Sequence, residues 1–321
     1  MIDFKVGILG AGKIAGVVAD TLNKLDAFCP YAIASRDMER ANEFGDKYNI
    51  EKRYGSYEEL ANDPDVELIY IATPHSHHAE QAKMCLNAGK PVLVEKAFTC
   101  DTKTASEVIK LSEEKKVFCG EAMWIRYLPL YMQLIDLINK GIIGQVNAVS
   151  CSLGYNLRDK ERVIRPEHGG GALLDLGVYP INLFTMIYKQ VPISIGATCV
   201  KLDTGVDAQE SLEFNYKNGK TAYAFLTMMY KADNNAIIYG DKGYIEVKNI
   251  NNPEELIIHD HEKVIANFEP PKNQISGYEY EFLAARTAII TGKFESSIMP
   301  HQDTIGIMNI IDGLRKNWKI I

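Results

Sequence analysis

The sequence lacks the features that would mark a secreted, membrane or nucleic-acid-binding protein. Its 321 residues contain no uninterrupted apolar run near the ~20 residues that span a bilayer. The net charge of −7 gives no excess of basic residues for nucleic acid. The N-terminus shows no basic segment followed by a cleavable apolar core, so no signal peptide is expected. We therefore expect a soluble protein with no nucleic-acid and no membrane partner.

Cysteine is also sparse, and its spacing is uninformative. The six cysteines are scattered, with no Cys-x-x-Cys pair. This pattern fits reduced thiols in a cytoplasmic protein better than a disulfide framework. The length favours two domains, which we place at residues 1–122 and 123–321.

What the chain does have, in its first part, is alternation of short apolar runs with helical patterns. The runs cover residues 4–12, 31–36, 66–74, 90–98 and 117–124, and helical spacing lies between them. Strands that alternate with helices imply right-handed crossovers and a parallel sheet. Residues 1–122 are therefore predicted to form an α/β dinucleotide-binding Rossmann domain.

The second part reads differently. Eight strand-like runs follow one another between residues 145 and 268, with Asn-Gly and Asp-Lys-Gly turns among them. A helix at residues 170–188 is embedded among these runs, and an amphipathic helix at 303–318 ends the chain. Residues 123–321 are predicted to form an α+β substrate and oligomerisation domain with a large, mostly antiparallel sheet.

One strand of this sheet is apolar on both faces. In the run "TAYAFLTMMY", one face carries Tyr223, Phe225 and Met229, and the other carries Ala224, Leu226 and Met228. An antiparallel sheet with one solvated face would alternate apolar with polar residues. The embedded helix can cover one face, so we expect a second copy of the chain to cover the other, giving a homodimer or larger homo-oligomer.

A glycine motif lies between the first strand and the first helix. Gly10, Gly12 and Ala15 match G-x-G-x-x-G/A. Gly10 permits the tight turn, Gly12 lets the backbone approach a pyrophosphate, and the helix N-terminus faces the phosphates. Glycine turns are common, but this one lies between a strand and a helix in an N-terminal βαβ pattern, which predicts dinucleotide binding. Lys13 and Ile14 are also expected to contact the cofactor.

The end of the second strand bears on the choice of cofactor. An NAD site usually offers Asp or Glu to the ribose 2′-hydroxyl there. This chain has Ser35 and Arg36 ahead of Asp37. A hydroxyl and a planar guanidinium suit a 2′-phosphate, so NADP is predicted. NAD stays an alternative, because Asp37 could turn inward.

Three histidines follow the third apolar run, in "TPHSHH". No carboxylate or cysteine stands near His75, His77 and His78 at metal-ligand spacing. The loop after this strand is where cofactor contacts fall in such domains. No metal site is therefore predicted, and the expected cofactor contacts in this loop are Thr73, Pro74, His75 and His78.

Three landmarks now stand in order: "GAGKIA", "VLVEKAF" with Glu95 and Lys96, and "GGALLDLGVY" with Asp175 and Tyr179. With these and "EAMWIRYLP", nearly the whole chain resembles the glucose–fructose oxidoreductase and inositol dehydrogenase family. It is most similar to the branch of dimeric dihydrodiol dehydrogenases and NADP-dependent D-xylose 1-dehydrogenases. The resemblance implies hydride transfer between nicotinamide and a hydroxyl carbon of a sugar, polyol or trans-dihydrodiol.

The resemblance also assigns roles to residues. It makes Lys96, Asp175 and Tyr179 catalytic, and places Glu95 and Lys96 at the cofactor. Many inositol dehydrogenases have His at the position of Tyr179, and Ala97 stands where the family motif has proline. A cis peptide without proline costs about 2.5–4 kcal/mol. The expected substrate contacts are Trp124, Arg126, Asn156, Asp175 and Tyr179.

The chemistry of these groups is consistent with alcohol oxidation. A phenol, with an ordinary pKa of about 10, is a poor base at neutral pH, and a neighbouring ammonium such as Lys96 favours its phenolate. Asp175 can accept a hydrogen bond from a substrate hydroxyl or orient Lys96. The glycines at 169–171 are expected to make room for substrate and cofactor. Two alternatives stay open: an NAD-dependent inositol or polyol dehydrogenase, and an NADP-binding sensor without catalysis.

Overall fold

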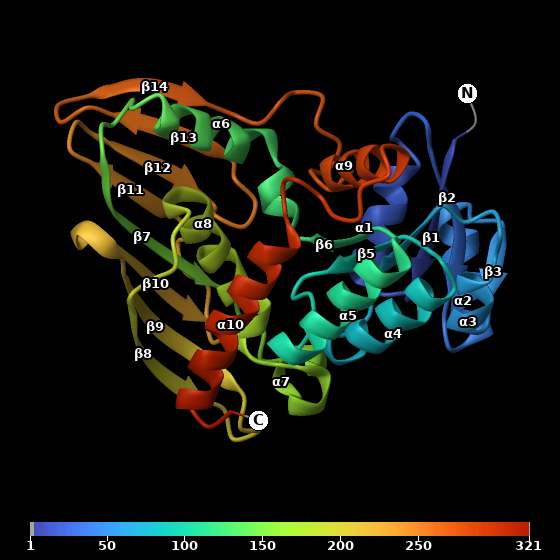
Figure 1. Ribbon diagram of the computed structural model, residues 1–321. Helices are drawn as coiled ribbons and strands as arrows, with labels where there is room; N and C mark the ends of the chain where they lie inside the picture. Colours follow the sequence, from blue (N-terminus) through green and yellow to red (C-terminus); the bar gives the residue numbers. More distant parts are fainter. Residues whose placement is uncertain (1–2, 321) are drawn as a thin grey trace. The chain divides into compact units, whose positions relative to one another are not determined.

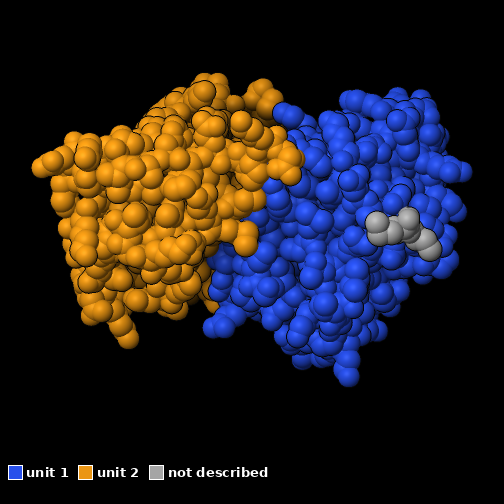
Figure 2. Space-filling model, turned by 90° about the horizontal axis from the view of Figure 1, so that it is seen from above, with its two compact units in different colours: residues 1–127, 274–305 blue, residues 128–273, 306–321 orange. Residues whose placement is uncertain are grey.

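The computed structural model describes residues 3–320, and the chain forms two compact units. The first comprises Met1–Tyr127 and Gln274–Ile305, and the second comprises Leu128–Asn273 and Gly306–Ile321 (Figure 2). Each unit has its own sheet and is described by itself. The fold class predicted from the sequence, a Rossmann sheet followed by a mostly antiparallel sheet, is confirmed.

The first unit is built on a six-stranded parallel sheet (Figure 1). Its order is β3-β2-β1-β4-β5-β6. The strands are β1 Phe4–Leu9, β2 Phe28–Ala34, β3 Lys52–Tyr54, β4 Leu68–Ile71, β5 Val92–Glu95 and β6 Cys119–Ala122. Strands β4 and β5 are buried along their whole length, as expected when helices cover both faces of a parallel sheet. The edge strand β3 was not predicted, because only three residues form it.

Five helices follow the strands of this segment, and all but the short α3 were predicted from the sequence. They are α1 Lys13–Leu22, α2 Met38–Tyr48, α3 Tyr57–Ala61, α4 His75–Asn87 and α5 Thr102–Lys115. Asp37 caps α2, Ser56 caps α3 and Asp101 caps α5, each by accepting a backbone N–H. Gly12 directly precedes helix α1 and provides no side-chain cap. A short 3₁₀ turn, η1 Trp124–Tyr127, ends the first segment of the unit.

A returning segment completes the first unit. Helix α9, Glu279–Ile290, places Phe282, Ala285 and Ala288 in the same apolar cluster as Phe4 and Phe28. The division at residue 122 assigned this helix to the second domain. Contiguous sequence could not show the return, because Phe4 and Phe28 of this cluster lie more than 250 residues before Phe282 in the chain. Helix α10, His301–Asn317, begins in the first unit and ends in the second.

The second unit contains an eight-stranded sheet of order β14-β13-β12-β11-β7-β10-β9-β8. The strands are β7 Val146–Gly154, β8 Ser194–Lys201, β9 Asp207–Asn215, β10 Thr221–Thr227, β11 Ala236–Gly240, β12 Tyr244–Lys248, β13 Glu255–His259 and β14 Val264–Phe268. Within residues 3–320, β10 and β7 are the one pair of neighbours in this sheet that run parallel. The eight predicted runs thus correspond to the eight strands.

One face of this sheet is covered by the embedded helix. Helix α6, Pro129–Asn139, precedes β7. Between β7 and β8 lie α7 Glu161–Ile164, η2 Pro166–His168, the π-helical turn η3 Leu173–Gly177 and α8 Val178–Tyr188. A 3₁₀ turn, η4 Lys217–Gly219, follows β9. Phe184 of α8 packs on Phe214 of β9 with ring centroids 5.3 Å apart. The Tyr188 hydroxyl donates to the carbonyl of Thr221 at 2.7 Å. Helix α8 is therefore fixed against β9 and β10.

The stretch Pro166–Tyr188 is long and apolar enough to cross a membrane, judged by length and composition alone. The unbroken apolar run within it is shorter, so a search for long apolar runs does not single this stretch out. In the structure 83% of the apolar window is buried inside the protein. That burial is typical of a core helix.

Candidate active site

The glycine loop after β1 has the shape of a phosphate cradle. Gly10 has φ +104°, and a Cβ there would lie 3.0 Å from the carbonyl oxygen of Ala72. Gly12 precedes α1 without a side-chain cap, so no side chain occupies the helix N-terminus. Lys13, the first residue of α1, is exposed, and Ile14 is half-buried. This loop fits a pyrophosphate held by backbone N–H groups.

The residues after β2 form a basic corner beside this loop. Asp37 accepts the N–H of Glu39 at 2.9 Å, so its carboxylate caps α2. Ser35 is buried, whereas Arg36 is exposed. Arg40 donates to the carbonyl of Ala11 at 3.4 Å and so reaches the glycine loop. Sequence reasoning missed Arg40. The available signal was its position in the first turn of the helix that Asp37 caps.

The histidines after β4 have structural partners. Pro74 directly precedes α4, and His75, the first residue of the helix, is buried beside His78. The two ring nitrogens of His78 lie 2.9 Å from the Ala97 carbonyl and 2.8 Å from the Thr73 carbonyl. Burial lowers the pKa of His78. His78 thus connects the loop after β4 to the loop after β5. Among residues 3–320 no group of three or more His, Cys, Asp or Glu could hold a metal ion.

Lys96 follows β5 directly, and its backbone is fixed by its neighbour. Glu95 is buried; one carboxylate oxygen accepts the N–H of Lys96 at 3.1 Å, and the other accepts the hydroxyl of Tyr70. The Lys96–Ala97 peptide bond is cis. Glu95 was predicted to contact the cofactor, but the bonds of its carboxylate run to protein groups. Lys96 itself is half-buried.

Trp124 and Arg126 lie in η1. Trp124 stacks on Tyr278, with ring centroids 4.5 Å apart and planes inclined by 2°. Its indole Nε1–H is buried and has no hydrogen-bond acceptor among residues 3–320. Arg126 pairs with Asp303 at 2.5 Å and also donates to the Ile298 carbonyl at 3.4 Å. Trp124 therefore offers a donor to a ligand, whereas these contacts direct the Arg126 guanidinium toward the segment before α10.

In the second unit Asp175 and Tyr179 lie on consecutive turns of one helical stretch. Asp175 is in the π-helical turn η3, and Tyr179 is in the first turn of α8. Both are buried, with 4% and 7% of their surface exposed. The sequence predicted a regular helix here. The π-helical turn is a difference, and such turns are rare and frequent at functional sites.

Asp175 has a cationic partner that the sequence did not reveal. Two guanidinium nitrogens of Arg162 donate to the two carboxylate oxygens of Asp175, at 2.9 and 3.3 Å. This bidentate geometry fixes the orientation of the carboxylate. Asn156, a predicted substrate contact, lies exposed in the preceding loop, and its Oδ1 accepts from Arg158 at 3.3 Å. Arg162 was hard to single out because charges of both signs surround it.

The glycines before Asp175 serve the packing of the chain itself. A Cβ on Gly170 would lie 2.4 Å from the carbonyl oxygen of Val163. Gly171 has φ +116°, and a Cβ there would lie 2.3 Å from a carboxylate oxygen of Asp207. We expected the missing side chains to make room for substrate and cofactor. The structure instead fills that space with a neighbouring carbonyl and a buried carboxylate.

Two family models match this chain. "Oxidoreductase family, NAD-binding Rossmann fold" covers residues 4–123, and "GFO/IDH/MocA C-terminal domain" covers residues 131–246. A trans-1,2-dihydrobenzene-1,2-diol dehydrogenase of Xenopus tropicalis is 35% identical over 316 residues, 96% of each chain. The chain belongs to this oxidoreductase family. The family assignment made from the sequence is thereby confirmed. The prediction that the protein is an NAD(P)-dependent dehydrogenase is confirmed as well.

Other relatives agree over the whole length. The enzyme of the same name from Danio rerio is 33% identical over 323 residues, covering 98% of this chain and 97% of its own. The solved aldose-aldose oxidoreductase from Caulobacter crescentus superposes with a TM-score of 0.90 at 20% identity, covering 99% of this chain and 98% of its own. At that identity the structural likeness supports the fold alone.

Proposed function

We propose that this oxidoreductase interconverts a hydroxyl and a carbonyl group on a sugar, polyol or trans-dihydrodiol, with Tyr179 as acid/base and Lys96 as its assistant. The observation that carries the proposal is the buried π-helical turn that presents Asp175, clamped by Arg162, one turn before Tyr179. The full-length relatives named trans-1,2-dihydrobenzene-1,2-diol dehydrogenase support a hydroxylated substrate.

Each group has a distinct task in this proposal. The bound nicotinamide supplies the acceptor for the hydride. Tyr179 takes the proton from the reacting hydroxyl, and the ammonium of Lys96 favours the phenolate that does so. Asp175 accepts a hydrogen bond from a second hydroxyl. The buried Nε1–H of Trp124 donates to a substrate oxygen, because a buried donor without an acceptor is costly.

We further propose that NADP is the preferred cofactor. Arg40 supplies a cation at the glycine loop, and the exposed Arg36 and the hydroxyl of Ser35 follow β2 directly. Arginine pairs with phosphate through its planar fork, which suits a 2′-phosphate. Asp37 is the residue that could favour NAD, but its carboxylate is used to cap α2. Michaelis constants measured with both cofactors would test this preference.

The reaction is tested by screening sugars, polyols including inositols, and trans-dihydrodiols for reduction of NADP and NAD, followed by absorbance. The matched control is Tyr179→Phe, which removes only the hydroxyl. General acid–base catalysis is worth roughly 10²–10⁴-fold, so the variant should lose turnover by about that factor while still binding cofactor. A Phe variant that retains more than about a tenth of the rate would exclude Tyr179 as acid/base.

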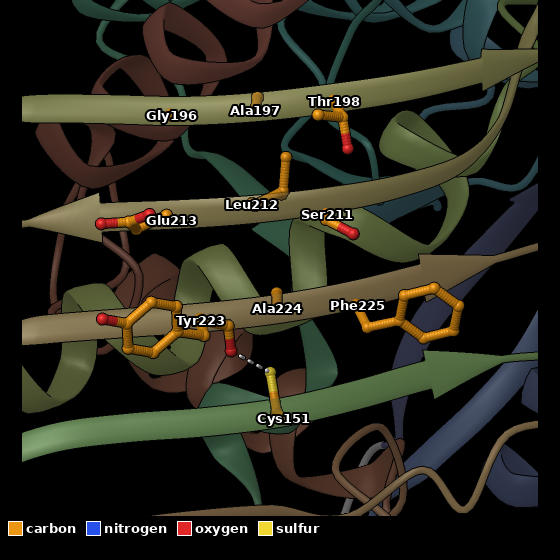
Figure 3. A pocket seen from close by; sticks show the side chains of 10 residues that line it. All are labelled: Cys151, Gly196, Ala197, Thr198, Ser211, Leu212, Glu213, Tyr223, Ala224 and Phe225. Atoms are coloured by element: carbon orange, nitrogen blue, oxygen red, sulfur yellow. Dashed lines mark hydrogen bonds between the residues drawn. The ribbon is translucent and has the colours of Figure 1, made fainter.

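We also propose that the outer face of the second sheet is a homodimer interface. On β10, Ala222, Ala224 and Leu226 are buried on the side that α8 covers, whereas 44% of Tyr223 is exposed on the other side. Figure 3 shows a hollow on the sheet lined from β7, β8, β9 and β10, with Tyr223 and Phe225 at one strand.

The apolar surface extends beyond this hollow. The exposed fractions are 56% for Val200 and 40% for Tyr239. Large exposed apolar patches mark interfaces, and a second copy of the chain is the partner we propose. Light scattering at micromolar concentration should give at least twice the monomer mass, and a monomer would overturn the proposal.

A cytoplasmic location is also proposed. None of the six cysteines takes part in a disulfide, as expected for a protein kept under reducing conditions. Cell fractionation would test it, and recovery in an oxidising compartment would refute it.

A further inference from the structure

A buried carboxylate with no role in the proposed reaction lies against the loop of residues 169–171 in the second unit. Asp207, the first residue of β9, is 1% exposed. One of its oxygens accepts the backbone N–H of Leu173 at 2.5 Å. Leu173 begins the π-helical turn that carries Asp175. Asp207 therefore contacts the turn at its N-terminus, from a strand more than 30 residues further along the chain.

This contact satisfies a donor that the helix itself cannot satisfy. The first N–H groups of a helical turn have no partner within it, and a carboxylate at that end is favourable. The η3 turn has no side-chain cap from its own flanking residue, Ala172. Asp207 thus replaces the missing cap from outside the helix.

The Asp207 carboxylate occupies space that is open because residue 171 is glycine. A Cβ on Gly171 would lie 2.3 Å from Asp207 Oδ1, and the φ of +116° at Gly171 disfavours any other residue. The backbone N–H of Gly171 is in turn bonded to the Val163 carbonyl at 2.8 Å. The loop is therefore anchored on both sides of the glycine.

A second buried acid lies beside the first. Glu210, also on β9, is 1% exposed. Burial, and then the charge and hydrogen bonding of Asp207, hold the pKa of Glu210 well above its usual range. Both carboxyl groups therefore lie close together at the start of β9, next to the Leu173 N–H that Asp207 accepts.

We propose that Asp207 is a positioning residue for the proposed catalytic turn, acting through the Leu173 N–H to set where Asp175 and Tyr179 lie. The inference rests on the proposed function for the identity of the reaction. The claim about the turn stands on the Asp207–Leu173 bond itself. A displacement of about 1 Å at a reacting group costs on the order of 10²-fold in rate.

The experiment compares Asp207→Ala with Asp207→Asn and Glu210→Gln. The Ala variant loses the acceptor, so kcat should fall roughly 10- to 100-fold while cofactor affinity, measured by fluorescence of the reduced cofactor, stays within about twofold. The Asn side chain still offers an oxygen to Leu173 and should recover most of the rate. Glu210→Gln, a neutral side chain of equal length on the same strand, is the matched control and should behave as wild type.

Amide hydrogen exchange of residues 171–177 gives a readout independent of activity. It should accelerate in Asp207→Ala and stay near the wild-type rate in the other two variants. Unchanged exchange in the Ala variant, or equal losses of kcat in the Ala and Asn variants, would overturn the proposal. If Asp207→Ala does not fold, Gly171→Ala replaces it, since its Cβ would push against Asp207 and should produce the same local exchange.

The proposed function has its own separate test in Asp175→Asn, which leaves the Asp207–Leu173 bond in place. Full turnover in that variant would remove Asp175 from the reaction. The exchange result would still decide whether Asp207 positions the turn.

Discussion

Glu121 is a buried carboxyl group whose titration should be visible in the stability of the first unit. It lies on β6 with 3% of its surface exposed, and one oxygen accepts the hydroxyl of Thr304 at 2.8 Å. Burial raises the pKa of Glu121 to about 7, against the opposing effects of the Thr304 hydrogen bond and the Arg126 charge. The proposed perturbation is Glu121→Gln, which keeps the size and an acceptor for Thr304 but removes the titration.

The sign and size of the effect follow from linkage. The folded protein binds this proton more tightly than the unfolded chain, so the stabilisation is fully present below pH 4.5 and is lost as pH rises to about 7. A rise in pKa from 4.5 to about 7 corresponds to about 3 kcal/mol. The free energy of unfolding of wild type should therefore fall by about that amount, relative to the Gln variant, across this range.

The assay is urea unfolding followed by tryptophan fluorescence from below pH 4.5 to above pH 7. Replacing Trp318 with Phe in both proteins leaves Trp124, which lies in the same unit as Glu121, as the reporter. Other buried acids, such as Glu281, titrate in both proteins and cancel in the difference. A difference that stays flat across the range would refute the reasoning.

Three further outcomes are expected. Arg36→Ala should weaken NADP binding by roughly 10- to 150-fold, the size of a lost charge-assisted hydrogen bond, and leave NAD nearly unchanged; equal losses in a titration with both cofactors would contradict a phosphate-selective role. Arg162→Gln should lower kcat roughly tenfold, because the buried Asp175 loses its clamp, and Arg162→Lys should recover only part, since it cannot bond both oxygens; steady-state kinetics that show no loss would exclude the clamp. Tyr223→Glu should yield monomers in light scattering, whereas Ile290→Glu should not, because Ile290 is an apolar residue of the first unit that is 67% exposed, against 44% for Tyr223; dimers in both would place the interface elsewhere.

The sequence predicted the fold well wherever the signal is local. The glycine loop, the alternation of strand and helix and the eight runs of the second sheet all depend on neighbouring residues. Helix α9 was missed because its apolar face is recognisable only against Phe4 and Phe28, which lie far away in the chain. Strand β3 was missed because three residues carry no periodicity.

The site residues could be predicted where they belong to a recognisable sequence motif. Asp175 and Tyr179 stood out because a carboxylate and a phenol interrupt an apolar run. Arg162 and Arg40 could not be singled out, because each lies among other charged residues and nothing in the sequence distinguishes it from them. Asp207 could not be identified at all, since its contact with the Leu173 N–H depends on how strand β9 passes beneath the loop.

The divided construction of the first unit has a consequence for how the protein is made. Domains generally begin to fold during synthesis, at about 5–20 residues per second. Residues 1–127 leave the ribosome without Phe282, Ala285 and Ala288, which complete their apolar cluster. Translation must continue for roughly 10 to 30 seconds before α9 follows. The second unit likewise includes residues 306–321, so each unit is completed by residues far along the chain, and the apolar surface that α9 covers stays without its partner until α9 has been synthesised.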